Sequence, residues 1–377
     1  MNFDFSPEQH QLADAVKRWA DKAYSFEHRR SVLRSERGCD DADWRALASL
    51  GLTALALPEA SGGFEGTTVD LLVVMQALGP CMLLEPLSAT IVAAEALRLA
   101  GGHDGVLKAV AAGDCKLATA FGERQARHDL ADVAVTAARE GDGWRIRGEK
   151  TMVLHGSQVD RLVVSARTSG GTRDASGITL FLVDAAGAGI ARKTLRTVDG
   201  LRADMLVLDT VVQAGACVGA QGEGHRLLDN VADFAAVIGC AEGVGVMEAL
   251  NAATLEYLRT RQQFGAPLGR QQVLQHRMVD MFIALEQARS LTLLAAMRAA
   301  GSDAAQRSRA VAAAKVQVSE ALQYVGEQAV HLHGGIGMTD ELPVSHLFKR
   351  ATMLAMNWGD PAHHIARFIA QPEFRHM

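Results

Sequence analysis

Hydrophobic residues recur at helical spacing in the last third of this chain. One set is spaced four, three, four and three residues apart, at Leu274, Met278, Met281, Leu285 and Ala288. A second set repeats this spacing at Val318, Leu322, Val325, Ala329 and Leu332. Residues spaced in this way share one face of an α-helix, so both stretches are predicted to be long helices. Gly334-Gly335 predicts the end of the second helix, and residues 222–377 are predicted to form a helical domain.

The middle of the chain has a different pattern. Short runs rich in β-branched and apolar residues are bounded by turn residues and predict strands at 132–139, 144–154, 161–167, 178–184 and 205–212. Gly141-Asp142-Gly143 lies between the first two runs and predicts a hairpin turn. Residues 114–221 are therefore predicted to form a β domain.

The first 113 residues again have a helical pattern. Ser6 before Pro7 is typical of an N-cap followed by proline at the first helical position. A helix that contains Trp44 is predicted to end near Gly51. The fold class is therefore α+β with several domains, in the order helical (1–113), β (114–221) and helical (222–377).

Composition and charge narrow the class of protein. The 377 residues are 49% hydrophobic and 21% charged, which is ordinary for a globular domain with a large core. Lys and Arg number 38 against 43 Asp and Glu, for a net charge of −5. This balance provides no basic surface for nucleic acid or an anionic membrane, so neither is expected as a partner.

The spacing of the cysteines indicates whether the chain has a metal site or disulfides. The N-terminal sequence indicates its cellular location. The five cysteines are far apart and form no C-x-x-C motif, so we expect no metal site and no disulfide framework, but buried free thiols in a reducing compartment. The N-terminal residues lack the basic and apolar regions of a signal peptide, and no continuous apolar run reaches roughly 18 residues. We therefore expect a cytoplasmic protein.

Two long motifs in the last domain are the most informative part of the sequence. Residues 257–272 read Y-L-R-T-R-Q-Q-F-G-A-P-L-G-R-Q-Q, and residues 331–344 read H-L-H-G-G-I-G-M-T-D-E-L-P-V. Both resemble signatures of the FAD-dependent acyl-CoA dehydrogenase family, whose domain order is also helical, β, helical. The resemblance covers essentially the whole chain. It implies an N-terminal helical domain, a middle β-barrel and a C-terminal four-helix bundle.

The resemblance implies FAD as the cofactor and a site for its ADP half. A flavin dinucleotide needs cationic donors at the pyrophosphate, an aromatic or amide group at the adenine, and backbone that a ligand can approach closely. The residues implied are Arg261, Phe264, Gln272, His331, Gly334 and Gly335, with histidine at 331 where the family usually has glutamine. Taken singly, Arg261 could be a solvated arginine at a helix end, and the glycine pair could be only a helix stop.

The two segments that contact the flavin ring in the family are altered here. The family's T-E-P-x-A-G-S-D loop corresponds to G-E-R-Q-A-R-H-D at 122–129, where Glu123, Ala126 and Asp129 match. The family's W-I-T-N-G loop corresponds to M-V-L-H-G at 152–156, so Leu154 stands where a threonine hydroxyl is usual. His155 could replace that polar contact, but we expect a solvated histidine on a turn.

The general base of the family is missing from its usual positions. The family's reaction needs a carboxylate to remove the α-proton of an acyl-CoA thioester. Trp358 aligns with the usual glutamate, and Ala235 aligns with an alternative glutamate position on the first helix of the last domain. Glu242 lies two turns further along that helix, about 10 Å away. Asp360 could serve as the catalytic base, but we expect it to N-cap a helix that begins at Pro361.

These features resemble one half of an unequal pair of subunits. The V-L-H-G run at 153–156 and the F-K-R run at 348–350 are similar to small subunits of heteromeric dehydrogenases for pimeloyl-CoA and sterol side chains. The implied partners are an acyl-CoA substrate, a base-containing homologous subunit and electron-transferring flavoprotein. Two alternatives stay open: a self-sufficient homotetramer that uses Asp360, and a non-enzymatic protein that binds acyl-CoA or a partner.

Overall fold

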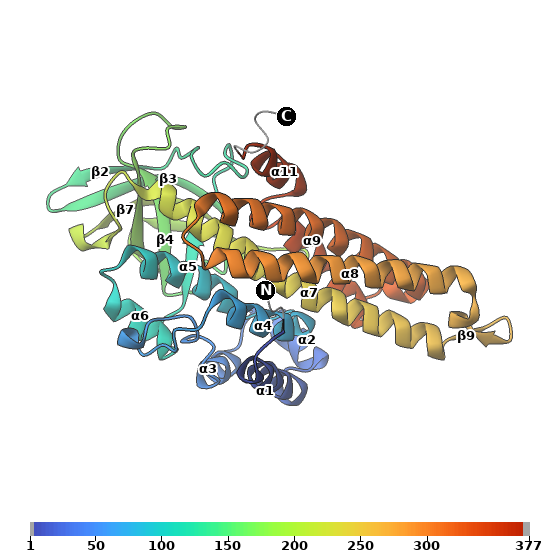
Figure 1. Ribbon diagram of the computed structural model, residues 1–377. Coiled ribbons are helices and arrows are strands. Elements are labelled where there is room, and N and C mark those ends of the chain that lie inside the picture. The colour runs from blue at the N-terminus through green and yellow to red at the C-terminus, as the bar shows by residue number, and fades with distance from the viewer. Residues whose placement is uncertain (1–3, 372–377) are drawn as a thin grey trace. The chain divides into compact units, whose positions relative to one another are not determined.

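The computed structural model describes residues 4–371, which divide into two compact units (Figure 1). The first unit contains residues up to 29, residues 67–83 and residues from 235 onward. The second contains residues 30–66 and 84–234. The helical N-terminal third thus contributes to both units. The domain boundaries at 113/114 and 221/222 stay predictions.

The second unit is built on one eight-stranded sheet. Its strands are β1 (Leu117–Ala120), β2 (Thr136–Glu140), β3 (Gly143–Leu154), β4 (Arg161–Arg167), β5 (Ile178–Asp184), β6 (Ile190–Arg196), β7 (Arg202–Val212) and β8 (Cys217–Val218). The order is β6-β7-β3-β2-β4-β5-β8, with β1 parallel to β4. The predicted hairpin joins β2 to β3, and Gly141 has φ 57°, as its turn requires.

The middle domain is rich in sheet, but the expected closed barrel is not found. Among the described residues the end strands β6 and β8 each pair with one neighbour, β7 and β5, and not with each other. Strand β8 has only two residues, and β2 pairs with β4 at the single pair Thr136 and Arg167. These short pairings leave the hydrogen-bonded ring open.

Helices α3 (Asp41–Ser49), α5 (Leu87–Ala100) and α6 (Asp104–Ala111) belong to the same unit. Asp40 caps α3 by accepting from backbone amides, and Gly51 follows the helix at φ 78°, as predicted. The Trp44 indole donates to the Gly113 carbonyl at 2.7 Å. Helix α5 packs against β1, β4 and β8 and covers that part of the sheet.

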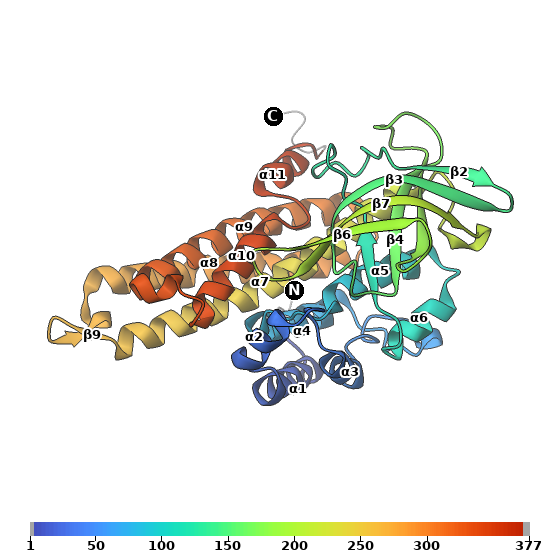
Figure 2. The ribbon, with the colours of Figure 1, turned by 180° about the vertical axis from the view of Figure 1, so that it is seen from behind.

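The first unit is helical. Its elements include α1 (Pro7–Ala23), α4 (Thr68–Leu78), α8 (Gln272–Ala299), α9 (Ala304–His333), α10 (Pro343–Met356) and α11 (Pro361–Ile369). Helix α2 (Phe26–Arg34) and helix α7 (Gly224–Thr260) contribute residues to both units. Helices α7 to α10 share one hydrophobic core. Figures 1 and 2 show α7, α8 and α9 side by side, with the hairpin that contains β9 at one end of the bundle.

The sequence patterns predict the long helices α8 and α9 and the strands β2, β3, β4, β5 and β7. Strands β4 and β5 have the predicted bounds, and the two predicted apolar stripes lie in the core of α8 and α9. Strands β1, β6 and β8 were missed. Strand β6 is exposed on both faces and therefore lacks an apolar pattern, whereas β1 and β8 are very short. Of the five free cysteines, four are buried as predicted, and Cys217 is half-buried.

Helix α7 is the only helix among residues 4–371 that is long and apolar enough to cross a membrane. Its most apolar window has a mean hydropathy of 1.3, yet 83% of that window is buried inside the protein. This environment is typical of the central helix of a large core.

Two glycines of α7 give a matched test of this packing. A Cβ at Gly245 would lie 2.9 Å from the Gln76 carbonyl carbon and 3.1 Å from the Gly79 Cα, whereas one at Gly239 would meet nothing within 4 Å. We expect Gly245→Ala to lower the free energy of unfolding by about 1–3 kcal/mol through overpacking. Gly239→Ala should raise it by up to about 1 kcal/mol through helix propensity. Urea denaturation checks both, and equal effects would contradict the close approach of α7 to Gly79.

Candidate functional site

The two long sequence motifs lie at the same end of the helical bundle. Tyr257, near the end of α7, stacks on His333, the last residue of α9, with ring centroids 4.5 Å apart. Arg277 of α8 approaches His331 with 3.1 Å between Nη1 and Nδ1. Residues far apart in sequence therefore form one surface, which we call the bundle end.

Three of the predicted cofactor residues follow α7 at the bundle end. Arg261 and Phe264 belong to a small hairpin of β9 (Gln262–Gln263) and β10 (Ala266–Pro267), and Gln272 is the first residue of α8. All three are exposed. Phe264 is 93% exposed and has φ 53°, a conformation that is strained for a bulky residue. Neither feature stabilises this chain alone, and the role of Phe264 at a cofactor stays a prediction.

The other three predicted residues end α9 or follow it. His331 is exposed on the last turn, and Gly334 and Gly335 begin a short 3-10 helix, η5 (Gly334–Met338). Gly334 has φ 66°, which explains its glycine. A Cβ at Gly335 would meet nothing within 4 Å, and its φ is not in the left-handed region, so packing within this chain does not require glycine there.

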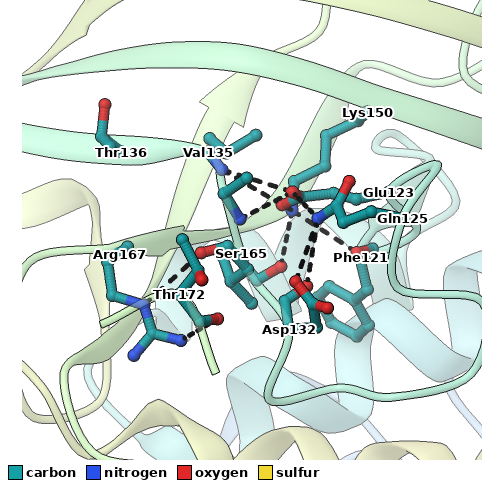
Figure 3. Close-up of polar contacts among 12 residues, drawn as sticks. Phe121, Glu123, Gln125, Asp132, Val135, Thr136, Lys150, Ser165, Arg167 and Thr172 are labelled. Carbon is teal, nitrogen blue, oxygen red and sulfur yellow. Dashed lines mark hydrogen bonds and ion pairs between the residues drawn. The ribbon is translucent and has the colours of Figure 1, made fainter. Parts of the chain in front are cut away.

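The sheet unit contains a buried ion pair that the sequence analysis did not identify (Figure 3). Lys150 of β3 is fully buried, and its Nζ lies 2.6 Å from Glu123 Oε1 and 2.9 Å from Ser165 Oγ of β4. Glu123 follows β1 and also accepts hydrogen bonds from the Ala134 amide, at 2.8 Å, and from the Val135 amide. Lys150 continues the alternation of Trp144 and Ile146 on the buried face of β3, and this was the available sequence signal.

Electrostatics keep this pair ionised at neutral pH. Burial would raise the pKa of Glu123, but Lys150, Gln125 and the Ala134 amide outweigh it and hold that pKa below its usual value. Burial lowers the pKa of Lys150 to about 8, and Glu123 opposes that shift. The two charges satisfy each other where water cannot reach them.

The expectation of a solvated His155 is wrong. The residue is only 3% exposed, and its Nδ1 lies 2.6 Å from Gln158 Oε1. Gln158 in turn donates to the Arg37 carbonyl at 2.7 Å. These residues cover the turn. The polarity of the residues next to His155 in sequence does not reveal this burial. His155 is therefore part of the unit's interior.

The segment between α10 and α11 contains Trp358 and Asp360. Asp360 caps α11, as predicted, by accepting from the His363 amide at 2.8 Å. Trp358 has φ 58°, and its carbonyl accepts from His364 Nε2 at 2.8 Å. A left-handed tryptophan is rare and is kept only where the surroundings hold it. The catalytic role of Asp360 stays a prediction.

A second buried lysine contacts the last turn of α10, just before this segment. Lys315 of α9 donates from Nζ to the carbonyls of Leu354 and Ala355, at 3.0 and 2.9 Å, at the end of α10. Ser319 also donates to the Ala355 carbonyl. A cation at a helix C-terminus interacts favourably with the helix dipole and satisfies unpaired carbonyls. The interruption of the apolar stripe of α9 by Lys315 was the sequence signal.

The remaining candidate carboxylate is already engaged. Glu242 of α7 forms a two-pronged pair with Arg350 of α10, with Oε1 to Nε at 2.6 Å and Oε2 to Nη2 at 2.7 Å. Both side chains are nearly buried, and Ala235 is 1% exposed. Glu242 therefore joins two helices and is not a free base.

A double-mutant cycle tests whether Lys150 and Glu123 interact in the folded protein. Lys150→Met should lower the free energy of unfolding by about 3–5 kcal/mol, because Glu123 is left charged and buried. Lys150→Met combined with Glu123→Gln should lose clearly less than the sum of the two single variants. Chemical denaturation of all four proteins measures the coupling, and additive losses would show that the two groups do not interact.

The pH dependence of folding stability tests the burial of a neutral His364. Burial lowers its pKa to about 3, so the folded protein keeps a neutral imidazole while the unfolded chain takes up a proton below its ordinary value near 6.5. The stability contributed by neutral His364 is therefore lost as pH falls from about 6.5 toward 3. The stability difference between the parent and His364→Gln should shrink by more than about 1 kcal/mol from pH 7 to pH 4. A difference that is constant with pH would contradict the burial of a neutral His364.

Comparison with known proteins identifies the family. Models of the N-terminal, middle and C-terminal domains of acyl-CoA dehydrogenases match residues 6–105, 118–211 and 222–367, in that order. The chain is 29% identical over 362 residues to the acyl-CoA dehydrogenase FadE27 of Mycobacterium tuberculosis (strain ATCC 25618 / H37Rv), and the match covers 93% of each protein.

Two solved structures extend this similarity to the fold. A variant of the Tcur3481-Tcur3483 steroid ACAD is 30% identical, with a TM-score of 0.87 and 96% of each chain covered. The ChsE4-ChsE5 complex from Mycobacterium tuberculosis is 28% identical, with a TM-score of 0.87 and 97% of each chain covered. FAD is the cofactor of this family, as the two motifs predicted. The three domain matches, their order and these full-length similarities make the chain a member of the acyl-CoA dehydrogenase family, a family of oxidoreductases.

Proposed function

We propose that this chain is the base-lacking subunit of an FAD-linked acyl-CoA dehydrogenase and acts with a homologous subunit that supplies the carboxylate. The observation that carries the proposal is that both carboxylates near the expected positions are engaged. Asp360 caps α11 and Glu242 pairs with Arg350. Trp358, at the position aligned with the usual glutamate, cannot accept a proton. If neither carboxylate acts as the base, the α-proton of the substrate goes to a carboxylate on another chain.

The bundle end supports the binding of FAD. Arg261 offers an exposed guanidinium for a pyrophosphate, Phe264 an exposed aromatic face, and Gln272 an amide. Gly334 and Gly335 leave backbone that a ligand can approach without meeting a side chain. When bound, FAD supplies the acceptor for the hydride that leaves the β-carbon. The residues of this chain bind and orient its ADP half.

An exposed apolar stripe on α8 supports a partner subunit. Phe282 and Ile283 lie three and four residues after Val279, and the three side chains are 58%, 46% and 55% exposed, respectively. Residues at this spacing share one helix face, and an exposed cluster of this kind is typical of an interface. The names of the Tcur3481-Tcur3483 and ChsE4-ChsE5 structures each join two different proteins. We infer that the present chain likewise works in an α2β2 complex.

The proposed substrate is supported by one of the same relatives, and the proposed electron acceptor rests on the family resemblance. We infer that the substrate is a bulky or dicarboxylic acyl-CoA, such as one that carries a sterol side chain, because one similar structure is described as a steroid ACAD. The complex would introduce a 2,3-double bond and pass electrons to electron-transferring flavoprotein. We place it in the cytoplasm.

A self-sufficient homotetramer that uses Asp360 is the main alternative. The burial of Asp360 is intermediate, and a catalytic role for its carboxylate can be tested directly. Asn at 360 retains an N-cap oxygen and cannot serve as a base. If Asp360→Asn leaves full activity in the isolated protein, this alternative fails.

Flavin content and subunit composition test the proposal. The chain is purified alone and after co-expression with a base-containing homologue from the same genome. We expect a mixed tetramer with one FAD per two chains, and little flavin in the chain alone. Phe264→Ala should reduce retained FAD by roughly tenfold, because base–aromatic stacking contributes about 1–3 kcal/mol.

One FAD per chain in an active homotetramer would instead establish an independent enzyme. A mixed complex without any flavin would support the third reading, a non-enzymatic protein that binds acyl-CoA or a partner. Phe282→Glu serves as the matched interface variant, since it should abolish the mixed complex and leave the helical content of the isolated chain unchanged.

A further inference from the structure

A buried arginine and a buried histidine are in contact inside the first unit. Arg29 of α2 and His346 of α10 are both buried, and Arg29 Nη1 lies 3.3 Å from His346 Nδ1. Arg29 Nε also donates to the carbonyl of Met82, a residue with φ 48°, at 2.8 Å. The ring of Phe26 packs edge-on against the imidazole, with centroids 5.0 Å apart. The contact between Arg29 and His346 is therefore enclosed by protein.

This contact fixes the tautomer of His346. A guanidinium has only N–H donors, so His346 Nδ1 accepts the hydrogen bond and carries no proton. In a neutral imidazole the proton then lies on Nε2. That nitrogen is 3.2 Å from the backbone carbonyl oxygen of Asp340, to which it donates. Arg29, His346 and Asp340 thus form a chain of two directed hydrogen bonds.

The chain of hydrogen bonds ends in residues 339–342, which connect η5 to α10 and which we call the link. At the start of the link, Thr339 donates to the Ile336 carbonyl from its amide, at 3.1 Å, and from its hydroxyl, at 2.8 Å. Within η5, a Cβ at Gly337 would lie 2.9 Å from the Cβ of His333, so η5 packs closely on α9. The 3-10 helix is therefore held by α9 on one side and by the link at its end.

His346 holds the link from the inside of the protein. The Asp340 side chain is 72% exposed, and its Oδ1 pairs with Lys349 Nζ at 2.7 Å on the surface. An exposed ion pair of this kind contributes little to stability. The buried hydrogen bond from His346 to the Asp340 carbonyl is thus the stronger restraint on the link.

The charges around His346 oppose its protonation. They are Arg29 of α2, Lys349 of α10 and Asp340, whose Oδ1 lies 3.8 Å from His346 Nε2. Burial lowers the pKa of His346, the hydrogen bond to the Asp340 backbone opposes this shift, and the charges of Arg29 and Lys349 lower the pKa further. The imidazole is therefore neutral at neutral pH and takes up a proton only below its ordinary pKa near 6.5.

We propose that His346 is a positioning residue whose neutral imidazole ties the link to Arg29, and that protonation of the imidazole releases the link. A proton on Nδ1 would point at a guanidinium that offers only N–H groups, in a place closed to water. The Arg29–His346 hydrogen bond is then lost, and α2, α10 and the link lose their common anchor. Histidine is the side chain whose charge ordinarily changes in this range of pH.

One consequence rests on the proposed function. The 3-10 helix η5 begins with Gly334 and Gly335, which we propose approach the ADP half of FAD. Release of the link frees the other end of the same short helix. The affinity of the mixed complex for FAD should therefore fall in acid to the extent that His346 is protonated.

The test compares the parent chain with His346→Gln and with His276→Gln as a control. Gln at 346 can accept from Arg29 with its carbonyl oxygen and donate to Asp340 with its amide nitrogen, and it does not titrate. His276 is exposed on α8, so its replacement removes a histidine without touching the link. Hydrogen exchange of residues 334–342 is measured at pH 7 and pH 4.5 and corrected for the intrinsic pH dependence of exchange.

Exchange should accelerate by roughly tenfold or more at pH 4.5 in the parent and in His276→Gln. Each pH unit between the pKa of the held imidazole and that of the released one adds a factor of about ten. His346→Gln should change by less than about twofold. The nitrogen chemical shifts of His346, assigned by their loss in His346→Gln, should show a protonated Nε2 and a bare Nδ1 at pH 7. Equal acceleration in all three proteins, or a proton on Nδ1 at pH 7, would overturn the inference.

The mixed complex tests the consequence for the cofactor. The dissociation constant for FAD should rise several-fold more between pH 7 and pH 4.5 in the parent than in His346→Gln. An equal rise in both would show that the link does not position the cofactor site. If the parent complex holds no flavin, the proposed function fails, and hydrogen exchange and the nitrogen shifts still decide whether His346 controls the link.

Discussion

A buried charge is tolerated only when it is fully paired, and this constraint organises both units of the chain. Lys150 and Glu123 join the segment after β1 to β3, Glu242 and Arg350 join α7 to α10, and Lys315 holds the end of α10. Each of these contacts is within hydrogen-bond distance and nearly closed to solvent. Removing one partner leaves a desolvated charge, so each segment has one favourable arrangement. Apolar packing alone would specify these positions less strictly.

Strain and buried charge occur at the same places in this chain. Met152 follows the buried Lys150 by two residues, and Trp358, whose carbonyl contacts the buried His364, follows Ala355, the acceptor for Lys315, by three. Strained backbone needs stronger restraint than ordinary loops, and buried polar contacts supply it. Phe264 differs, because nothing in the described part of this chain covers its side chain.

The sequence predicts regular elements well and contacts between distant residues poorly. Strands β4 and β5 and the cores of α8 and α9 follow from periodicity because each has one clearly buried face. Strand β6 has no buried face and carries no such signal. The motifs indicate which residues belong to the cofactor site, and the N-cap role of Asp360 follows from Pro361. The burial of His155 depends on residues such as Gln158 that local polarity does not reveal.

The exposure of Phe264 affects how the unassembled chain is handled in the cell. A newly made copy carries this phenylalanine, Phe282 and Met338 in water, at 93%, 58% and 73% exposure. Chaperones and proteases recognise exposed apolar side chains of this kind, so an assembly that covers them, as the proposed mixed complex would, protects the chain from removal. In the proposed mixed complex, this would match the amount of the chain to that of its partner without separate control of synthesis.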